Sequence, residues 1–125
     1  MGIELSYQEE PGLLRADMTG KWTSDSMRDA IGAARVEADR RNLKTLLVDA
    51  RGISMPEDEL TRFLAGVRWA DLFDQRFHAA FLVTPAVYNG FAETVARNRG
   101  ANVKAFFEAG PARAWLADTS SSPSG

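Results

Sequence analysis

The first twenty residues alternate in a way that predicts a β-hairpin. Residues 3–8 place apolar and polar side chains at every second position, which is the period of a half-buried strand, and residues 13–19 read as a second strand. Pro11 and Gly12 lie between the two segments, and both residue types favour tight turns. The pattern therefore predicts two antiparallel strands.

Further along, strands alternate with helical patterns. An unbroken apolar run at residues 46–48 is typical of a parallel strand buried on both faces. Two more strands are predicted at residues 77–83 and 102–107. Between the strands, apolar residues recur at helical spacing and predict four helices. Their inward stripes are Met27, Ala30, Ile31, Ala34 and Ala38; Leu60, Phe63, Leu64 and Val67; Tyr88, Phe91, Ala92 and Val95; and Ala114, Trp115 and Leu116.

The resulting order, β-β-α-β-α-β-α-β-α, predicts a single α/β domain. Right-handed crossovers between successive strands give a mostly parallel sheet with helices packed on it, and the hairpin adds an antiparallel N-terminal edge. We expect this domain to span residues 1–117. Residues 118–125, rich in Ser, Pro and Gly, have little apolar surface to bury and are expected to form a disordered tail.

Trp69 and Phe73 do not fit the stripe of the second helix. At about 100° per residue they fall on the side opposite Leu60. One interpretation is that the helix ends or bends near Arg68, so that both rings enter the core. The alternative is an exposed aromatic patch that marks a dimer surface or a ligand lid.

Composition narrows the class of function. The chain has 125 residues, a formal net charge of -2 and no cysteine. This length can bury a core without disulfides, and the charge disfavours a nucleic-acid partner. The first residues do not resemble a signal peptide, and no apolar run approaches the roughly 20 residues of a transmembrane segment. We therefore expect a cytoplasmic domain.

No pattern in the sequence indicates an enzyme. His78 is the only histidine and has no carboxylate in its strand, so a base or metal role is not expected. Ser24, Ser26 and Ser54 lack the context of a serine nucleophile. The glycines form no phosphate-binding loop. We expect no catalytic residues, no metal site and no cofactor.

Asp49 and Arg51 follow the central apolar run, where open α/β sheets gather ligands. They could recognise a polar ligand head or a charged group of a partner. The other interpretation is that Asp49 accepts nearby backbone N–H groups and Arg51 is solvated. Asp49, Thr84 and Lys104 also resemble the triad of phospho-receiver domains, but the acidic pair that such domains need would lie in the hairpin here, which disfavours this reading.

Several short motifs, taken together, resemble the STAS-like proteins related to bacterial anti-sigma-factor antagonists, in particular the branch that joins STAS and CRAL-TRIO-type domains. The resemblance covers almost the whole chain apart from the tail, and it rests on the order and spacing of weak motifs. These are Gly12-Leu13-Leu14, Gly20-Lys21-Trp22-Thr23, Leu46-Leu47-Val48-Asp49, Ala80-Phe81-Leu82-Val83, Val103-Lys104-Ala105-Phe106 and Ala114-Trp115-Leu116.

The resemblance implies a small non-catalytic module for protein regulation or for holding an apolar molecule. Anti-sigma antagonists are switched by phosphorylation of a serine or threonine in an Asp-Ser loop after the central strand. This chain has Ile53-Ser54-Met55-Pro56-Glu57-Asp58 there, without the Asp-Ser pair. The acidic residues would repel a phosphate, so we expect no phospho-switch, with Ser54 as its remnant.

Two hypotheses of function follow. The favoured one is a regulatory interaction domain that binds itself or another protein through the second helix, with Trp69 and Phe73, and through the loop with Asp49 and Arg51. The alternative is a carrier of a small apolar, lipid-like molecule, with the second helix as a lid. The candidate binding residues for the two hypotheses are Asp49, Arg51, Phe63, Val67, Trp69, Phe73, Thr84, Tyr88 and Phe91.

Overall fold

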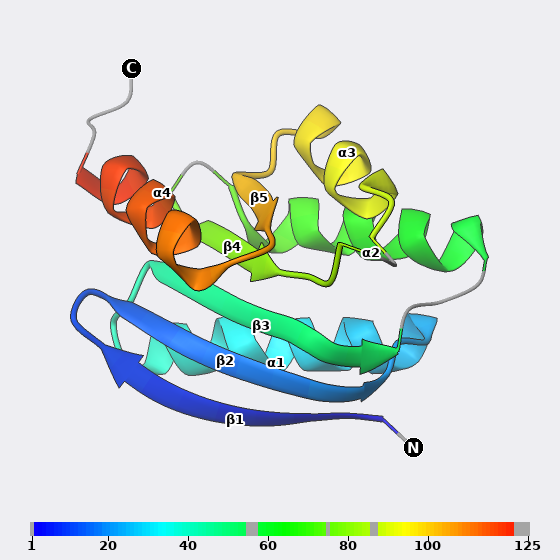
Figure 1. Ribbon diagram of the computed structural model, residues 1–125, viewed down its shortest axis with the longest axis horizontal. Helices are drawn as coiled ribbons and strands as arrows, with labels where there is room; N and C mark the ends of the chain where they lie inside the picture. Colours follow the sequence, from blue (N-terminus) through cyan, green and yellow to red (C-terminus); the bar gives the residue numbers. More distant parts are fainter. Residues whose placement is uncertain (1, 55–57, 75, 86–87, 122–125) are drawn as a thin grey trace.

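Five strands form one sheet whose spatial order follows the sequence, β1-β2-β3-β4-β5 (Figure 1). The computed structural model describes residues 2–54, 58–74, 76–85 and 88–121, with side chains described as far as Asp118. β1 pairs antiparallel with β2, and the other neighbouring strands are parallel, which confirms the predicted mixed sheet. The strands are β1 (Ile3–Glu10), β2 (Leu13–Lys21), β3 (Thr45–Ser54), β4 (His78–Leu82) and β5 (Val103–Phe106).

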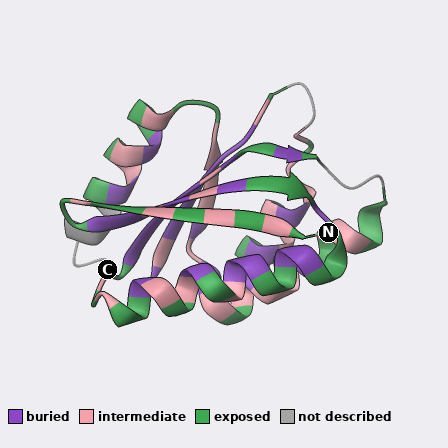
Figure 2. Cartoon of the chain, turned by 90° about the horizontal axis from the view of Figure 1, so that it is seen from below, coloured by how far each residue is buried: buried purple, intermediate pink, exposed green. Residues whose placement is uncertain are grey.

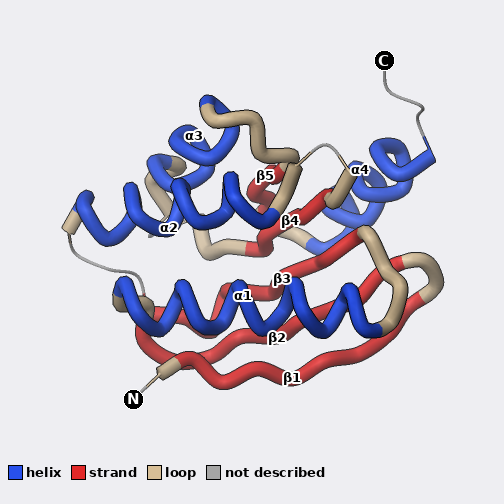
Figure 3. The backbone as a smooth tube through the Cα atoms, turned by 180° about the vertical axis from the view of Figure 1, so that it is seen from behind, coloured by secondary structure: helices blue, strands red, loops and turns tan. Residues whose placement is uncertain are grey.

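Four helices cover the two faces of the sheet unequally (Figures 1 and 3). α1, α2 and α3 enclose the larger hydrophobic core on one face, and α4 covers a smaller core on the other. The predicted element order is confirmed. The helices are α1 (Ser24–Arg40), α2 (Glu59–Leu72), α3 (Phe91–Asn98) and α4 (Ala109–Ser121).

α4 continues to Ser121, so it includes the first residues of the segment 118–125. Residues 122–125 lie outside the described part of the chain. The domain limit at residue 117 and the disorder of the tail stay predictions.

The ends of α1 follow from its sequence. Thr23 caps the helix by accepting the backbone N–H of Ser26 at 3.0 Å, and the Ser26 hydroxyl accepts the backbone N–H of Thr23 at 2.7 Å. Beyond its C-terminus, Asn42 takes the left-handed conformation, with φ of 60°. Asparagine tolerates this conformation better than most residues.

β3 is longer than the apolar run that predicts it. Leu46, Leu47 and Val48 are fully buried, but the strand continues through Asp49 to Ser54. The reason is that β2 extends to Lys21 and supplies a partner beyond the last residue of β4. Asp49 therefore lies within a strand, and the expectation of a loop at Asp49 and Arg51 is wrong.

α2 faces the opposite way from the prediction. Leu60 is 63% exposed and Leu64 43% exposed, whereas Ala65, Gly66 and Trp69 are buried. The cause is close packing against α3, because a Cβ on Gly66 would come within 2.6 Å of the Ala92 carbonyl oxygen. Only a face of small residues can approach α3 this closely, so the longer aliphatic side chains are left outside.

The sheet itself is buried unevenly, as Figure 2 shows. Residues of β1 alternate between exposed and half-buried, whereas β4 is buried along almost its whole length. β1 is an edge strand, and α4 packs mainly against β4 on its face of the sheet. The polar side of the hairpin is therefore left open beside α4 (Figure 1).

Candidate functional site

Trp69 and Phe73 belong to the core. Trp69 is 4% exposed and Phe73 is fully buried, and their rings contact Phe81 and Phe77. α2 continues past Arg68 to Leu72, so both rings reach the core without the helix ending early. The interpretation of an exposed aromatic patch at these two residues is wrong.

The apolar surface of α2 is instead formed by Leu60, Phe63 and Leu64, which we call the outer face of α2. All three side chains are exposed, and their spacing places them on one side of the helix. The guanidinium of Arg99 lies over the Phe63 ring, 5.7 Å from its centroid. Contiguous apolar patches of this kind mark interaction sites more often than isolated apolar residues do.

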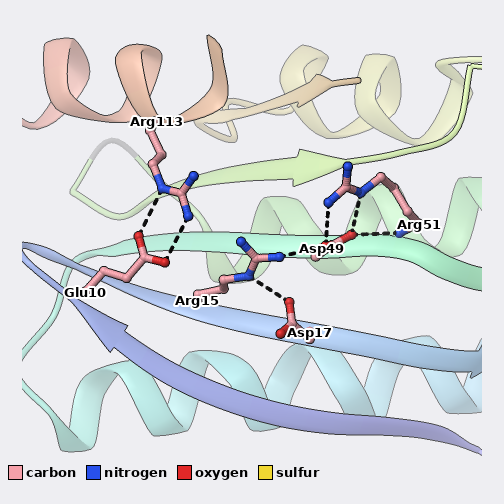
Figure 4. A network of polar contacts seen from close by, with 6 residues as sticks. All are labelled: Glu10, Arg15, Asp17, Asp49, Arg51 and Arg113. Atoms are coloured by element: carbon pink, nitrogen blue, oxygen red, sulfur yellow. Dashed lines mark hydrogen bonds and ion pairs between the residues drawn. The ribbon is translucent and has the colours of Figure 1, made fainter. Parts of the chain in front are cut away.

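A network of ion pairs lies on the open face of the sheet (Figure 4). Asp17 of β2 and Asp49 of β3 are register partners on neighbouring strands. Arg15 lies between them, with its Nε 2.9 Å from Asp17 Oδ1 and its Nη2 2.9 Å from Asp49 Oδ2. One guanidinium thus compensates two carboxylates that the parallel register brings together.

Arg51 completes the network by holding Asp49 through three hydrogen bonds. Its Nε and Nη2 lie 3.0 and 2.8 Å from the two carboxylate oxygens, and its backbone N–H donates to Oδ1 at 3.1 Å. The hydrogen bonds from Arg51 hold the pKa of Asp49 below its usual value, against the opposing effect of burial. The interpretation that Asp49 accepts a nearby backbone N–H therefore holds. Arg51, however, is not simply solvated, because it forms an ion pair with Asp49.

A second ion pair ties the hairpin to α4. Arg113 donates from Nε and Nη2 to the two carboxylate oxygens of Glu10, at 3.0 and 2.9 Å (Figure 4). The guanidinium lowers the pKa of Glu10 mainly through this side-chain hydrogen bond. The contact joins residues that are far apart in the sequence and fixes one end of α4 over the sheet.

The remaining candidates surround the start of α3. Tyr88 donates from its hydroxyl to Glu93 Oε1 at 2.5 Å, and Glu93 Oε2 accepts the backbone N–H of Ala105 at 3.0 Å. Burial, strengthened by Glu93, raises the pKa of Tyr88. Thr84 is half-buried, and its carbonyl accepts the backbone N–H of Tyr88 at 3.2 Å. Phe91 is half-buried at the first position of α3.

The carrier hypothesis assigns six of the candidate residues to one cleft, and the structure does not bring all six together: Phe63, Val67, Trp69, Phe73, Tyr88 and Phe91. Phe63 is on the outer face of α2, and Phe73 is in the core. A small apolar cavity of about 20 Å³ is lined by Trp69 and Tyr88 together with residues of several strands. This volume admits about one water molecule, which is far less than a lipid chain needs.

The loop after β3, where the sequence resemblance would place a phospho-switch, is described only at its ends. Ser54 is exposed at the end of β3, and its carbonyl accepts the backbone N–H of Trp22 at 3.0 Å. Residues 55–57, which include Pro56 and Glu57, lie outside the described residues. The absence of a phospho-switch stays a prediction.

His78 begins β4 and faces Asn102, whose Nδ2 lies 3.3 Å from the imidazole Nδ1. Burial lowers the pKa of His78. Within the described ranges, no three Asp, Glu or His side chains are grouped to hold a metal ion. Nor does any helix there have the length and apolar character needed to cross a bilayer.

Sequence reasoning missed Arg15 and Asp17, which complete the site at Asp49. Their alternation with apolar residues along β2 was visible, but the strand pairing that puts Asp17 beside Asp49 was not. It also missed Glu93, whose role depends on how α3 meets β5. Pairing β2 with β3 in an assumed register would have placed Arg15 and Asp17 beside Asp49.

The structure resembles that of an uncharacterized protein of the DUF3478 family, with a SpoIIAA-like fold, from Shewanella loihica PV-4. The match covers 92% of this chain and 93% of that chain, with a TM-score of 0.57 and 13% sequence identity. No protein-family model matches this sequence, and a search of curated proteins found no match. At this identity the likeness shows the fold. It confirms the STAS-like α/β architecture that the sequence motifs indicated.

Proposed function

We propose that this chain, a domain with the SpoIIAA-like fold, is a non-catalytic module that binds protein through the outer face of α2. The observation that carries the proposal is the exposure of Leu60, Phe63 and Leu64 on one helix face while Trp69 fills the core. Burying such side chains in an interface stabilises a complex in proportion to the apolar area removed from water. The bound protein is either a second copy or a different chain.

The ion-pair network at Asp49 forms a second proposed contact surface. Arg51 and Asp17 have side chains that are 44% and 42% exposed, so a partner can reach both charges. Within the network two arginines balance two aspartates. Such a surface contributes to the choice of partner more than to affinity.

The experiment is affinity capture from an extract of the source cells, with identification of the retained proteins, including untagged copies of this chain. The double variant Leu60→Ser with Phe63→Ser removes the apolar side chains. Val36→Ser is the matched control, because Val36 is 58% exposed on α1 and lies outside this face. We predict that wild type and Val36→Ser retain the same proteins and that the double variant loses them. Identical retention by all three would refute the proposal.

The apolar-carrier alternative keeps a distinct test. A carrier that uses α2 as a lid must open the core around Trp69, since the cavity there is only about 20 Å³. Native mass spectrometry of freshly purified protein would then show an added mass that denaturation releases. A spectrum with the bare chain mass removes this alternative and leaves the interaction module unaffected.

A further inference from the structure

A groove of about 220 Å³ lies between the start of α1 and the middle of α2. It is separate from the ion-pair network on the other face of the sheet. Apolar side chains form part of its wall, namely Trp22, Leu64, Ala65 and Val67. Leu64 is shared with the outer face of α2, but Leu60 and Phe63 are not part of the lining.

Arg68 lines the groove without a partner of its own. The described part of the chain offers it neither a hydrogen bond nor an ion pair, and its Nε is buried. One terminal nitrogen lies 3.4 Å from the point that a Cβ on Gly32 would occupy, so the guanidinium is held between α1 and α2. A cation held in this way is stabilised by an anion that accepts its N–H groups.

Trp22 adds a second donor without a partner. Its side chain is 6% exposed, and no acceptor for its indole Nε1 is found among the described residues. Both indole and guanidinium nitrogens can only donate hydrogen bonds. Two residues that line the groove, Trp22 and Arg68, therefore carry a buried donor without an acceptor in the described ranges, although the oxygens of Ser24, Thr61 and Asp71 also line it.

Of the residues that the structure describes, two other charged side chains line the groove, Arg28 and Asp71. Neither is a free cation. Arg28 lies 3.5 Å from Asp25 and 3.4 Å from Asp29, so two carboxylates neutralise it. Asp71 also lines the groove, one helical turn beyond Arg68, and forms no ion pair with it. Arg68 is therefore the cation that an anionic ligand would meet, and Asp71 would oppose the binding of that ligand.

We propose that the groove between α1 and α2 binds a small monocarboxylic acid with a short apolar chain. The carboxylate pairs with Arg68, and the chain lies against Trp22 and Val67. The groove, at about 220 Å³, has about ten times the volume of the cavity beside Trp69, so it offers room for a short-chain acid where that cavity does not. The site shares Leu64 with the outer face of α2 but does not include Leu60 or Phe63.

The test is a titration of ¹⁵N-labelled protein with sodium hexanoate, followed at the indole N–H resonances. Trp22→Phe assigns the Trp22 signal. 1-Hexanol and hexylammonium chloride, at matched ionic strength, are the controls for chain and charge. We expect a saturable shift of the Trp22 signal with hexanoate alone. Absence of saturation with hexanoate, or equal shifts with hexanol, overturns the proposal.

Variants locate the carboxylate. Arg68→Gln should raise the hexanoate Kd by about tenfold or more, as expected for loss of a charge-assisted hydrogen bond. Arg28→Gln and Leu60→Ser should leave it within about twofold of wild type, since Arg28 is already paired and Leu60 lies outside the lining. An unchanged Kd in Arg68→Gln overturns the assignment.

If Arg68→Gln fails to fold, Asp71→Asn provides a second test of a carboxylate bound beside Arg68. Removing the competing carboxylate should lower the hexanoate Kd, because Asp71 lines the same groove. A weaker or unaltered affinity in Asp71→Asn contradicts a carboxylate bound beside Arg68. Because Leu60→Ser disrupts only the proposed protein interface, failure of either proposal can be recognised without the other.

Discussion

Trp69 stacks on Phe81, with ring centroids 4.4 Å apart and planes 22° from parallel. This contact joins α2 to the central part of the sheet and determines which side of the helix faces outward. With Trp69 directed to the core, Leu60 is left exposed on the other side. The orientation of α2 therefore determines where the proposed interface lies.

Substitutions on the two sides of α2 should differ sharply in their effect on stability. Trp69→Ala should lower the free energy of unfolding by about 3–5 kcal/mol, because it empties a buried aromatic site. Leu60→Ala should change it by less than about 0.5 kcal/mol, as for most exposed positions. Urea unfolding followed by far-ultraviolet circular dichroism measures both. A larger loss for Leu60→Ala than for Trp69→Ala would mean that α2 is oriented as its apolar stripe predicts, and equal losses would contradict the orientation described here.

Gly32 of α1 and Gly66 of α2 offer a matched pair of helical glycines. Gly66→Ala should destabilise the fold by about 1–3 kcal/mol, because its Cβ would come within 2.6 Å of the Ala92 carbonyl oxygen and 2.7 Å of Val95 Cβ. At Gly32 the added Cβ meets only the end of the Arg68 side chain, at 3.4 Å. Gly32→Ala should therefore stabilise the protein by up to about 1 kcal/mol, through helix propensity. Thermal unfolding of the two variants checks the sign of each effect.

The fold could be predicted from the sequence, but the orientation of α2 could not. The apolar run at residues 46–48 and the alternation in residues 3–8 depend on local periodicity, which the structure confirms. In α2 the longer aliphatic residues point outward, because the small Ala65 and Gly66 are needed against α3. The hydrophobic stripe of a single helix does not indicate that small residues must face a neighbouring helix.

The candidate site was predicted only as far as single strands allow. Asp49 and Arg51 were found from their position after the apolar run, and they do form an ion pair. Arg15 and Asp17 entered the site through the pairing of β2 with β3, which is a tertiary property. The same limit applies to Arg68, whose unpartnered state depends on the packing of α1 against α2.

The ion pairs of Asp49 should make stability depend on pH. The pKa of Asp49 is lower in the folded protein than in the unfolded chain, so its contribution is fully present above about pH 4 and is lost as the pH falls through the folded-state value. Asp49→Asn should cost about 1–3 kcal/mol at pH 7. The difference from wild type should shrink below about pH 4.

Asp17→Asn is the control for this prediction. Among the described residues, Asp17 forms an ion pair with Arg15 alone and is more exposed than Asp49, so its loss should cost less at pH 7. Urea unfolding at pH 7 and at about pH 3 gives the four differences. A gap between wild type and Asp49→Asn that stays constant with pH would show that the carboxylate contributes through its shape and not its charge.

Glu93 should stabilise the junction of α3 with β5. Glu93→Ala removes the acceptor of both the Tyr88 hydroxyl and the Ala105 backbone N–H, and should cost about 1–3 kcal/mol. The same change should lower the raised pKa of Tyr88, since Glu93 contributes to that shift after burial. Alkaline titration of tyrosine absorbance, with Tyr88→Phe to identify the signal, measures the pKa. Titration curves that coincide for wild type and Glu93→Ala would refute this role.

The central claim is that the outer face of α2 is a surface for binding protein, and the lack of cysteine in the chain permits a direct test. Single cysteines at Leu60→Cys and Val36→Cys, both exposed positions, can be alkylated and followed by mass spectrometry. We predict equal rates in dilute protein. In concentrated protein, or in source-cell extract cleared of small thiols, only Leu60→Cys should slow, by several-fold. A Leu60→Cys thiol that is already protected in dilute protein, or that is never protected, would contradict the account.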